Sequence, residues 1–354
     1  MIFEGKRILV TGGTGSMGKT FVRRVLTGEL GTPAKVIVFS RDEAKQHDMR
    51  MSYLNRFAAT DEVIYRNFMN VLEFRIGDVR DYSDVCRAVK NADIVVNAAA
   101  LKQVPTCEYF PGQAVLTNCM GAMNIVRAIE ENEYAVETVV AISTDKACKP
   151  VNVMGMTKSI QERIFTAANV LNPDTRFICV RYGNVLASRG SVIPLFHDQI
   201  RNGGPVTITV PEMTRFLLTL DQAVDTVFTA LREAKPGETY VPRAPSATVI
   251  NIAKGLIGKA DIGIKTIGIR PGEKMHEIMV SQEEANHCVR RGDFMAILPM
   301  LPELCDDCEP NGNFLQSEFS SADTVMTEEE TLALLNRHNL IAHDGQSHQE
   351  ELLR

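Results

Sequence analysis

A carboxylic acid and an amine stand side by side at Asp145 and Lys146, in the stretch STDK that follows an apolar, β-branched run. Such a pair suits acid–base chemistry, because one group can remove a proton while the other supplies one. The alternative is an ion pair exposed in a surface loop. Further along, Met154 precedes Lys158, and its thioether has no proton to exchange. From these residues alone, both a catalytic pair and a surface ion pair remain open for Asp145 and Lys146.

A glycine-rich turn follows the first β-branched run and opens a helix-like stretch, GKTFVRRVL. Its glycines have GxxGxxG spacing, which lets the backbone approach a pyrophosphate at the N-terminus of a helix. A simple tight turn is the alternative. The position between a strand and a helix favours a dinucleotide site. The residues that we expect to bind the cofactor here are Gly12, Thr14, Gly15, Ser16, Met17 and Gly18.

The residues at the end of the second β-branched run indicate which nicotinamide dinucleotide, NAD or NADP, the chain binds. A carboxylate there usually binds the ribose 2′-hydroxyl of NAD, whereas this chain has Ser40 and Arg41. A hydroxyl and a guanidinium suit a 2′-phosphate, so we predict NADP. Asp42 follows closely and weakens this argument, and a helix-capping serine with a solvated arginine is the alternative. Seven residues after the third and fourth runs are expected to flank adenine and ribose: Gly77, Asp78, Val79, Asn97, Ala98, Ala99 and Ala100.

The elements that must position these residues alternate between strands and helices. The β-branched runs are apolar throughout, as in strands of a parallel sheet that is covered on both faces. Helix-like stretches separate them, which predicts right-handed crossovers and an α/β fold. The sequence therefore predicts a Rossmann-like, doubly wound parallel sheet. Its expected strands span 7–11, 35–40, 72–76, 93–98, 138–143 and 176–181.

After about residue 185 the alternation gives way to Pro/Gly-rich pieces such as RNGGPVTITVPEMTRF and GIRPGEK. This composition suits a smaller α/β substrate lobe over the carboxyl ends of the strands, where ligands of open α/β sheets bind. We predict a dinucleotide-binding domain over 1–185 with a return segment at about 216–245, the lobe over 186–215 and 246–335, and a flexible tail over 336–354.

The composition is that of an ordinary globular chain, with 354 residues, 45% hydrophobic and 23% charged. A net charge of −6 gives no reason to expect nucleic acid or a membrane as a partner. We expect no signal peptide and no membrane span. Eight scattered cysteines fit buried thiols in a reducing cytoplasm. Cys305 and Cys308 have metal spacing, but no second pair follows, and we predict no metal site.

Further motifs carry a family resemblance from about residue 5 to about 335: NAAALKQVPTCEYFP, TNCMGAMNIV, RYGNVLASRGSVIPLF, TVPEMTRFL and RPGEKMHE. With STDK and MGMTK they resemble the UDP-N-acetylglucosamine 4,6-dehydratases of the extended short-chain dehydrogenase/reductase family, most closely the inverting, capsule-type (CapE-like) members. The resemblance implies conversion of UDP-N-acetylglucosamine to UDP-2-acetamido-2,6-dideoxy-L-arabino-hex-4-ulose for bacterial surface polysaccharide. The same group contains C5-retaining dehydratases and 4-epimerases.

The resemblance also implies a mechanism. The cofactor takes hydride from sugar C4, a base removes the C5 proton, the C6 hydroxyl leaves as water, and hydride returns to C6. Lys146 would be the C5 base, and it must be neutral for this, so we expect the nicotinamide and Lys158 to lower its pKa. Asp145 would act as the general acid for the leaving hydroxyl.

In the wider superfamily a Tyr stands where this chain has Met154, and it takes the proton of the oxidised hydroxyl. The dehydratase group that the chain resembles also carries Met there. The resemblance leaves Asp145 as the expected acceptor of the C4 proton, with Thr144 or a water as the alternative relay. Ser143 is expected to hydrogen-bond the substrate near C4, and Lys158 to bind the nicotinamide ribose.

Other residues are assigned by their match to the family motifs. Those expected at the cofactor are Lys102, Asn118, Lys158, Tyr182, Asn184 and Val185. Those expected at the UDP-sugar are Lys102, Asn184, Ser188, Arg189, Val192, Thr209, Arg215, Arg270, Glu273 and Glu277. Converging guanidiniums suit a diphosphate, although single arginines and Lys102 are more often surface charges. Glu273 and Glu277 are expected at the uridine ribose, or in salt bridges with Lys274 and His276.

Two apolar helices, over 113–132 and 155–170, are paired between subunits in the proteins that the chain resembles. We therefore expect a homo-oligomer, a hexamer first and a dimer as the alternative. The second enzymatic hypothesis is a UDP-sugar 4-epimerase, which eliminates no water and needs no C5 base. A third hypothesis is an NADP-binding sensor that has lost activity together with the Tyr.

Overall fold

The structure is a computed structural model that describes residues 1–54, 62–186, 191–305 and 315–341. Its largest element is a nine-stranded sheet with the order β14-β15-β10-β6-β5-β4-β1-β2-β3. The strands from β3 to β10 pair in parallel, whereas β15 and β14 complete one edge in antiparallel pairing. They are β1 (Arg7–Thr11), β2 (Lys35–Ser40), β3 (Leu72–Ile76), β4 (Ile94–Asn97), β5 (Thr138–Ile142), β6 (Arg176–Val180), β10 (Thr239–Pro242), β14 (Cys288–Arg291) and β15 (Phe294–Ile297).

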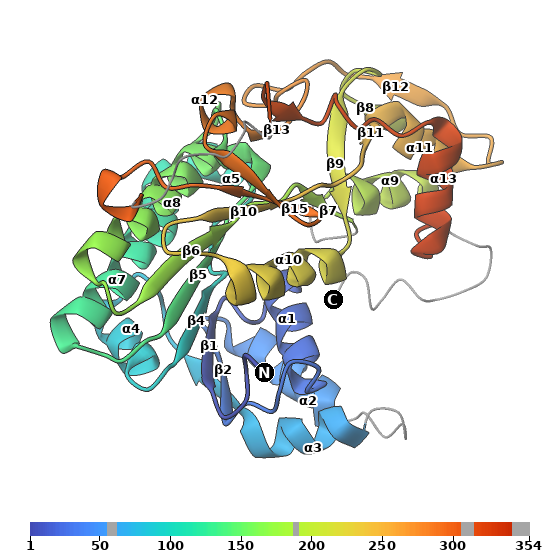
Figure 1. Cartoon of the computed structure of the whole chain (residues 1–354). Helices are drawn as coiled ribbons and strands as arrows, with labels where there is room; N and C mark the ends of the chain where they lie inside the picture. The colour runs from blue at the N-terminus through green and yellow to red at the C-terminus, as the bar shows by residue number, and fades with distance from the viewer. Residues whose placement is uncertain (55–61, 187–190, 306–314, 342–354) are drawn as a thin grey trace.

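Helices cover both faces of this sheet, which makes it Rossmann-like and doubly wound (Figure 1). Ile8 and Val10 of β1 belong to one buried cluster and Leu9 to the other, because successive side chains of a strand point to opposite faces. The first face is covered by α1 (Ser16–Leu26), α2 (Glu43–Leu54), α3 (Glu62–Val71) and α10 (Leu220–Glu233). The second is covered by α4 (Tyr82–Val89), α7 (Gly121–Asn132) and α8 (Val153–Leu171).

A smaller lobe with its own apolar cluster gathers beyond the β10 side of the sheet, at the upper right of Figure 1. It contains a three-stranded sheet of order β11-β9-β7 and two strand pairs, β8 with β12 and β13 with β16. The strands are β7 (Asn184–Val185), β8 (Val206–Ile208), β9 (Thr214–Leu218), β11 (Ser246–Thr248), β12 (Ile264–Thr266), β13 (Ile278–Val280) and β16 (Phe319–Ser320). The helices are α9 (Val192–Arg201), α11 (Val249–Ile257), α12 (Gln282–Ala285), the 3₁₀ turn η4 (Pro302–Leu304) and α13 (Glu328–Arg337).

A buried ion-pair triad ties the lobe to the sheet. Arg181, just after β6, donates to Glu162 of α8 at 2.7 Å and to Glu284 of α12 at 2.9 Å. All three side chains are nearly excluded from solvent. Removing one partner of a buried pair leaves an uncompensated charge, so the triad holds α8, β6 and α12 together.

All six strands expected from the β-branched runs are present, with bounds that differ by at most one residue. The chain returns to the sheet at 288–297, however, whereas we expected those residues in the lobe. The expected tail also begins later, because Leu340 is buried in the lobe cluster and residues 342–354 lie outside the described part. The division into domains otherwise stays a prediction. No helix in the described part of the chain is long and apolar enough to cross a membrane.

The helix expected over 113–132 has three parts: α6 (Pro111–Ala114), the π-helix η2 (Val115–Met120) and α7. It follows α5 (Val104–Tyr109). Within η2, the Asn118 side chain accepts from the Leu101 N–H at 2.9 Å and donates to Thr157 of α8 at 2.9 Å. A π-turn admits one more residue than an α-turn and is frequent at functional sites. Here it places residues of η2 between the loop after β4 and α8.

Candidate active site

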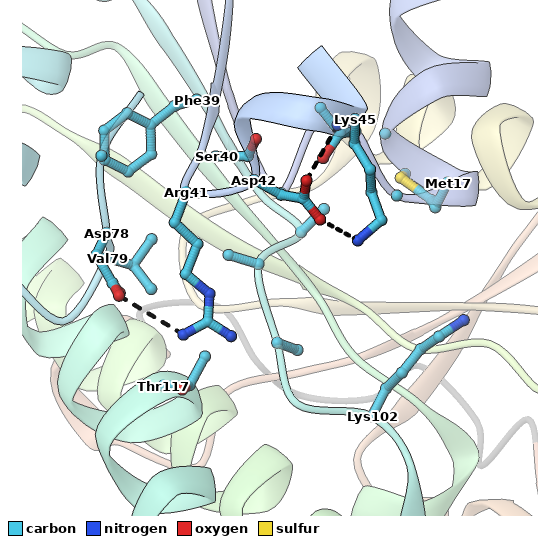
Figure 2. A pocket seen from close by; sticks show the side chains of 18 of the residues that line it. Met17, Phe39, Ser40, Arg41, Asp42, Lys45, Asp78, Val79, Lys102 and Thr117 are labelled. Atoms are coloured by element: carbon cyan, nitrogen blue, oxygen red, sulfur yellow. Dashed lines mark hydrogen bonds and ion pairs between the residues drawn. The ribbon is translucent and has the colours of Figure 1, made fainter. Parts of the chain in front are cut away.

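A cavity of about 370 Å³ lies at the carboxyl ends of β1, β2, β3 and β4 (Figure 2). Fourteen residues that the sequence predicted for the cofactor line it: Gly12, Thr14, Gly15, Ser16, Met17, Gly18, Ser40, Arg41, Asp78, Val79, Ala98, Ala99, Ala100 and Lys102. Gly77, also expected beside adenine and ribose, lines it too, whereas the sequence reasoning did not predict four others: Phe39, Asp42, Lys45 and Thr117. The cavity joins residues that the sequence places far apart.

The glycines of the first turn are required by close backbone contacts. Gly12 has φ +65°, and a Cβ on it would lie 2.7 Å from the backbone nitrogen of Ala99. A Cβ on Gly18 would lie 2.6 Å from Cα of Gly13. Gly15, the N-cap of α1, offers no side-chain cap to the first turn of the helix. That helix end therefore presents N–H groups to the cavity, as a pyrophosphate site requires.

Paired charges surround the ribose end of the cavity. The Arg41 guanidinium is about half exposed and lies 3.6 Å from the Asp78 carboxylate (Figure 2). Arg80 also binds Asp78, and Lys45 pairs with Asp42. Burial raises the pKa of Asp78, but the bonds from Arg80 and the charge of Arg41 outweigh it, so that pKa lies below its ordinary value. Three cations thus face two carboxylates, an excess of positive charge that suits a phosphate.

A second group of residues lies where β5 ends. The 3₁₀ turn η3 (Asp145–Ala147) follows that strand, and the Asp145 side chain is completely buried. The Lys146 ammonium lies 3.0 Å from Asp145 Oδ1, 3.1 Å from Glu277 Oε1 and 3.2 Å from Asn184 Oδ1. The exposed surface ion pair that was the alternative for residues 145 and 146 is therefore wrong.

Helix α8 is built to pass close over this turn. Asn152 caps it by accepting from the Gly155 N–H at 2.8 Å. A Cβ on Gly155 would lie 2.2 Å from the Lys146 carbonyl oxygen, so only glycine lets the helix and the turn approach this closely. The helix thereby fixes the backbone from which Asp145 and Lys146 project.

The pKa of Lys146 is shifted in the direction opposite to the expected one. Burial lowers the pKa of Lys146, but the charges of Asp145 and Glu277 outweigh it, so that this pKa lies above its ordinary value. Burial raises the pKa of Asp145, and the charge of Glu277 raises it further. The expectation of a Lys146 with a lowered pKa is wrong for this structure, because the sequence gave no sign that a second carboxylate reaches the amine.

The position of the missing Tyr is apolar. Met154 is buried in a small cluster with Cys107 and Ala114, and Leu101 packs against it. A thioether has no proton to exchange, so Met154 supplies neither an acid nor a base at this position.

Lys158 and Ser143 are both committed to protein groups. The Lys158 amine is buried and donates to the Ile142 carbonyl at 2.7 Å and to Gln161 at 2.9 Å. Burial lowers its pKa to about 8. The Ser143 hydroxyl is buried and donates to Glu162, a member of the ion-pair triad. The expected substrate contact of Ser143 is thus corrected: its proton points to Glu162.

The predicted substrate residues do not form one group. Glu277 is buried beside Lys146 instead of lying at a ribose, because it comes within 3.9 Å of Arg215 and within 3.1 Å of the amine. Arg215 donates to the carbonyls of Thr214 and Lys274, so its guanidinium also faces inward. Arg270 is exposed. Arg189, the third of the expected arginines, and Ser188 lie outside the described residues, so the convergence of the three guanidiniums stays a prediction.

The remaining predicted residues have simpler surroundings. Tyr182 is buried just after β6, and Asn184 and Val185 form β7. Val192 opens α9, and the Thr209 hydroxyl contacts the Met213 sulfur at 2.8 Å. Glu273 accepts from the backbone of Arg270 at 3.5 Å. Asn118 is buried behind the cavity wall, where it holds Leu101 and Thr157.

Thr117 is a cavity residue that the sequence reasoning missed. It belongs to η2, and its buried hydroxyl has no hydrogen-bond partner among the described residues. Its neighbour Asn118 was predicted instead, because an α-helical spacing does not distinguish which of the two faces the cavity. A polar residue next to a conformational irregularity is the sign that would have found it.

The chain matches the family described as "Polysaccharide biosynthesis protein" over residues 8–299, most of its length. It belongs to this family. The polysaccharide biosynthesis protein is 42% identical over 301 residues to a UDP-glucose 4-epimerase of Rickettsia canadensis (strain McKiel), which covers 84% of each chain. It is 40% identical over 303 residues to a UDP-N-acetylglucosamine 4,6-dehydratase (inverting) of Campylobacter jejuni subsp. jejuni serotype O:23/36 (strain 81-176), which covers 85% of each chain.

Solved structures agree with the fold. The structure of Pen from Bacillus thuringiensis superposes on the polysaccharide biosynthesis protein with a TM-score of 0.85 and 33% identity, over 96% of this chain and 100% of that one. DesIV, a dTDP-glucose 4,6-dehydratase from Streptomyces venezuelae with NAD and TYD bound, gives 0.64 with 21% identity, over 76% of this chain and 86% of that one. The second likeness shows the shared fold alone, that of the extended short-chain reductases.

Metal-binding spacing in the sequence has no counterpart in the described residues. Cys305 donates to the Pro299 carbonyl at 3.0 Å, and Cys308 lies outside the described residues. Across 1–54, 62–186, 191–305 and 315–341, no three His, Cys, Asp or Glu side chains are grouped to hold a metal ion. The described residues that are candidates for a function are therefore those of the cavity and those around Lys146.

The buried amine of Lys158 predicts a pH-dependent stability. Below pH 8 the amine is charged in both folded and unfolded chains, whereas between about 8 and 10.5 only the unfolded chain binds the proton. Stability from this residue therefore rises with pH across that window. We expect Lys158→Met to be more stable relative to wild type at pH 7 than at pH 10.5, by about 3 kcal/mol.

Urea unfolding of both proteins at the two pH values measures this difference, and the other titrating groups cancel in it. An equal difference at both pH values would show that the amine is not held in the low-pKa state.

Proposed function

We propose that this polysaccharide biosynthesis protein is an NADP-dependent, inverting UDP-N-acetylglucosamine 4,6-dehydratase of bacterial surface polysaccharide synthesis. The observation that carries the proposal is the pair at the end of β5 between the fully buried Asp145 and Lys146, whose side chain is 21% exposed. Elimination of water across C5 and C6 needs both an acid and a base, whereas epimerisation at C4 needs no base for C5. The 40% identical Campylobacter jejuni relative, which is named for this reaction, supports the choice.

The residues of the first cavity fit a nicotinamide dinucleotide. Gly12, Gly15 and Gly18 leave room for the pyrophosphate at the α1 N-terminus, and Arg41 and Lys45 lie at the ribose end. A bound cofactor of this type supplies the hydride acceptor for C4 and the hydride donor for C6. The positive excess at the ribose end supports NADP.

Asp145 is suited to move a proton between C4 and C6. Burial raises its pKa, so a carboxyl at this place can hold the C4 hydroxyl proton until the C6 hydroxyl leaves. The Thr144 hydroxyl donates to Asp145 Oδ1 at 2.9 Å and provides the alternative relay. Lys146 removes the C5 proton, and inversion requires that a proton then reach the opposite face of C5 from solvent. Inversion at C5 rests on the resemblance and on the Campylobacter jejuni relative.

A UDP-sugar 4-epimerase is the second candidate, and the relatives give a specific reason to keep it. The Rickettsia relatives named UDP-glucose 4-epimerase are 42% to 43% identical to this chain. The names of these relatives favour the epimerase, whereas the acid–base pair at the end of β5 favours the dehydratase.

We further propose a homo-oligomer, a hexamer first and a dimer as the alternative. Large apolar side chains are exposed on the helices from α5 to α8, where solvent contact is unfavourable. They are Tyr109, Phe110, Val115, Leu116, Met123, Val151, Met156 and Ile160.

Product analysis in deuterium oxide tests the reaction. UDP-N-acetylglucosamine should give a UDP-4-keto-6-deoxyhexosamine with no net use of NADP, one deuterium at C5 and the former C4 hydrogen at C6. Nuclear magnetic resonance of the product reads all three. UDP-N-acetylgalactosamine as the sole product, without deuterium at C5, would leave the epimerase as the function.

The position of Arg41 predicts that the protein prefers NADP to NAD. Replacing it in Arg41→Asp puts a negative charge where the 2′-phosphate would lie, so NADPH affinity should fall by at least about tenfold more than NADH affinity. Fluorescence titration with both cofactors measures this, and Arg87→Asp, an exposed arginine of α4, is the matched control. Equal or tighter binding of NADH by the wild type would contradict the NADP assignment.

Met154 and Asp145 should differ sharply in their effect on C4 oxidation. Met154→Ala removes packing in a small apolar cluster, so it should slow cofactor reduction only modestly. Asp145→Asn removes the proton acceptor and should slow it by about 10² to 10⁴. Single-turnover absorbance of the bound cofactor gives both rates. A Met154→Ala protein as slow as Asp145→Asn would mean that the thioether itself is required.

A further inference from the structure

Glu277 lies at the centre of the buried charges, although the sequence placed it at the ribose. Its side chain is 2% exposed, and Oε1 lies 3.1 Å from the Lys146 ammonium and 3.9 Å from Arg215. Lys274 and Arg215 are the cations that face it, and Asp145 is the other carboxylate at the amine. These groups come from η3, from β9 and from the loop before β13, which the fold brings together.

The contacts of Lys146 leave no lone pair in this arrangement. An ammonium has three N–H donors, and three acceptor oxygens lie within 3.2 Å: Asp145 Oδ1, Glu277 Oε1 and Asn184 Oδ1. A neutral amine has two donors and one lone pair, so one of these contacts would have to be lost. The structure therefore holds Lys146 in the protonated form, in which it cannot be a base.

Counting protons through the proposed reaction shows what is missing. Oxidation at C4 delivers the hydroxyl proton to Asp145, which keeps it for the C6 hydroxyl. Lys146 must lose its own proton before it can remove the one at C5. The Asn184 amide oxygen is not a base, and Asp145 is then occupied. Among the groups in contact with the amine, only the Glu277 carboxylate is left.

We propose, on the basis of the proposed dehydratase function, that Glu277 takes the proton that Lys146 must lose before it acts at C5. In this step one Nζ–H bond breaks and one carboxyl O–H bond forms, and no other reactant is needed. Lys146 then removes and keeps the C5 proton, solvent delivers a proton to the opposite face of C5, and Glu277 finally gives its own proton to solvent. Because Glu277 acts through Lys146, it is a positioning residue and does not touch the sugar.

Two features make this transfer possible at the right moment. Glu277 Oε2 is buried without a hydrogen-bond partner among the described residues, so a proton there displaces no existing bond. Protonation of Asp145 at the C4 step also removes one of the two negative charges that hold the Lys146 proton. Oxidation at C4 therefore weakens the hold on that proton just before the amine is needed.

The first experiment follows Lys146 in the protein without ligand. Competitive acylation of lysine amines across a pH series, read by mass spectrometry, reports the pH at which each amine becomes reactive. In Glu277→Gln the Lys146 transition should fall by about one pH unit or more, because one of its two carboxylate partners becomes neutral. Glu328→Gln, which removes an exposed surface partner of Lys254, is the matched control and should leave it unchanged.

The second experiment separates two steps of one turnover in deuterium oxide. In Glu277→Gln, absorbance should show cofactor reduction within about threefold of wild type, whereas deuterium uptake at C5 should slow by about 100-fold. Raising the pH should restore C5 exchange, because solvent then removes the Lys146 proton. Equal losses in both steps without recovery at high pH, or no loss at all, would overturn the proposal.

Glu277→Asp keeps the test decisive if the Gln variant does not fold. The shorter carboxylate keeps its charge but moves away from the amine, so C5 exchange should slow by about tenfold while C4 oxidation is spared. Equal loss of both steps would again contradict the role of Glu277. A wild-type protein that takes up no deuterium at C5 would refute the dehydratase function itself, whereas a normal wild type with an unaffected Glu277→Gln refutes only this inference.

Discussion

The Lys146 ammonium lies among three protein oxygens, on a side chain that is 21% exposed, and much of the structure serves to bring those oxygens together. An uncompensated charge inside a protein is strongly destabilising, so each partner must arrive in place. Asp145 follows the end of β5, Asn184 forms β7 and Glu277 precedes β13. The contact between sheet and lobe is therefore part of the active site, and the Arg181 triad reinforces it from behind.

The need to surround the Lys146 charge also explains which residues stand where the wider superfamily has a Tyr. The helix that would carry it presents Met154 to an apolar cluster and Gly155 to the backbone of η3. That helix thus supports the acid–base pair from the other side and supplies no acid or base of its own at this position. In the proposed mechanism the proton chemistry belongs instead to the residues that the first turn of α8 presses against.

Much of the fold could be predicted from the sequence, because it depends on local pattern. Apolar, β-branched runs fixed the first six strands, and glycine spacing located the dinucleotide cavity. The short edge strands β14 and β15 escaped, since CVRR and FMAI carry no long apolar run. The π-helix escaped as well, and with it Thr117, because a shift of one residue within a helix leaves no mark on apolar periodicity.

The catalytic pair was found from two adjacent residues, but its charge state was not. The sequence separates Glu277 from Lys146 by more than a hundred positions, and nothing local indicates that they meet. Since the sign of a pKa shift depends on which charges lie within a few ångströms, it follows from tertiary structure alone. For the same reason the sequence could not show that Arg215 turns inward, toward backbone carbonyls and Glu277.

The path of the chain has a consequence for how such proteins diversify. After β6 it enters the lobe, returns to the sheet for α10 and β10, leaves again, returns for β15 and β14, and ends in the lobe with α13. Because the lobe is formed by several separate stretches of the chain, one recombination event cannot exchange it as a unit. New specificities in this architecture must arise by point substitutions and loop insertions within each stretch, and designed chimaeras would need a junction at every crossing.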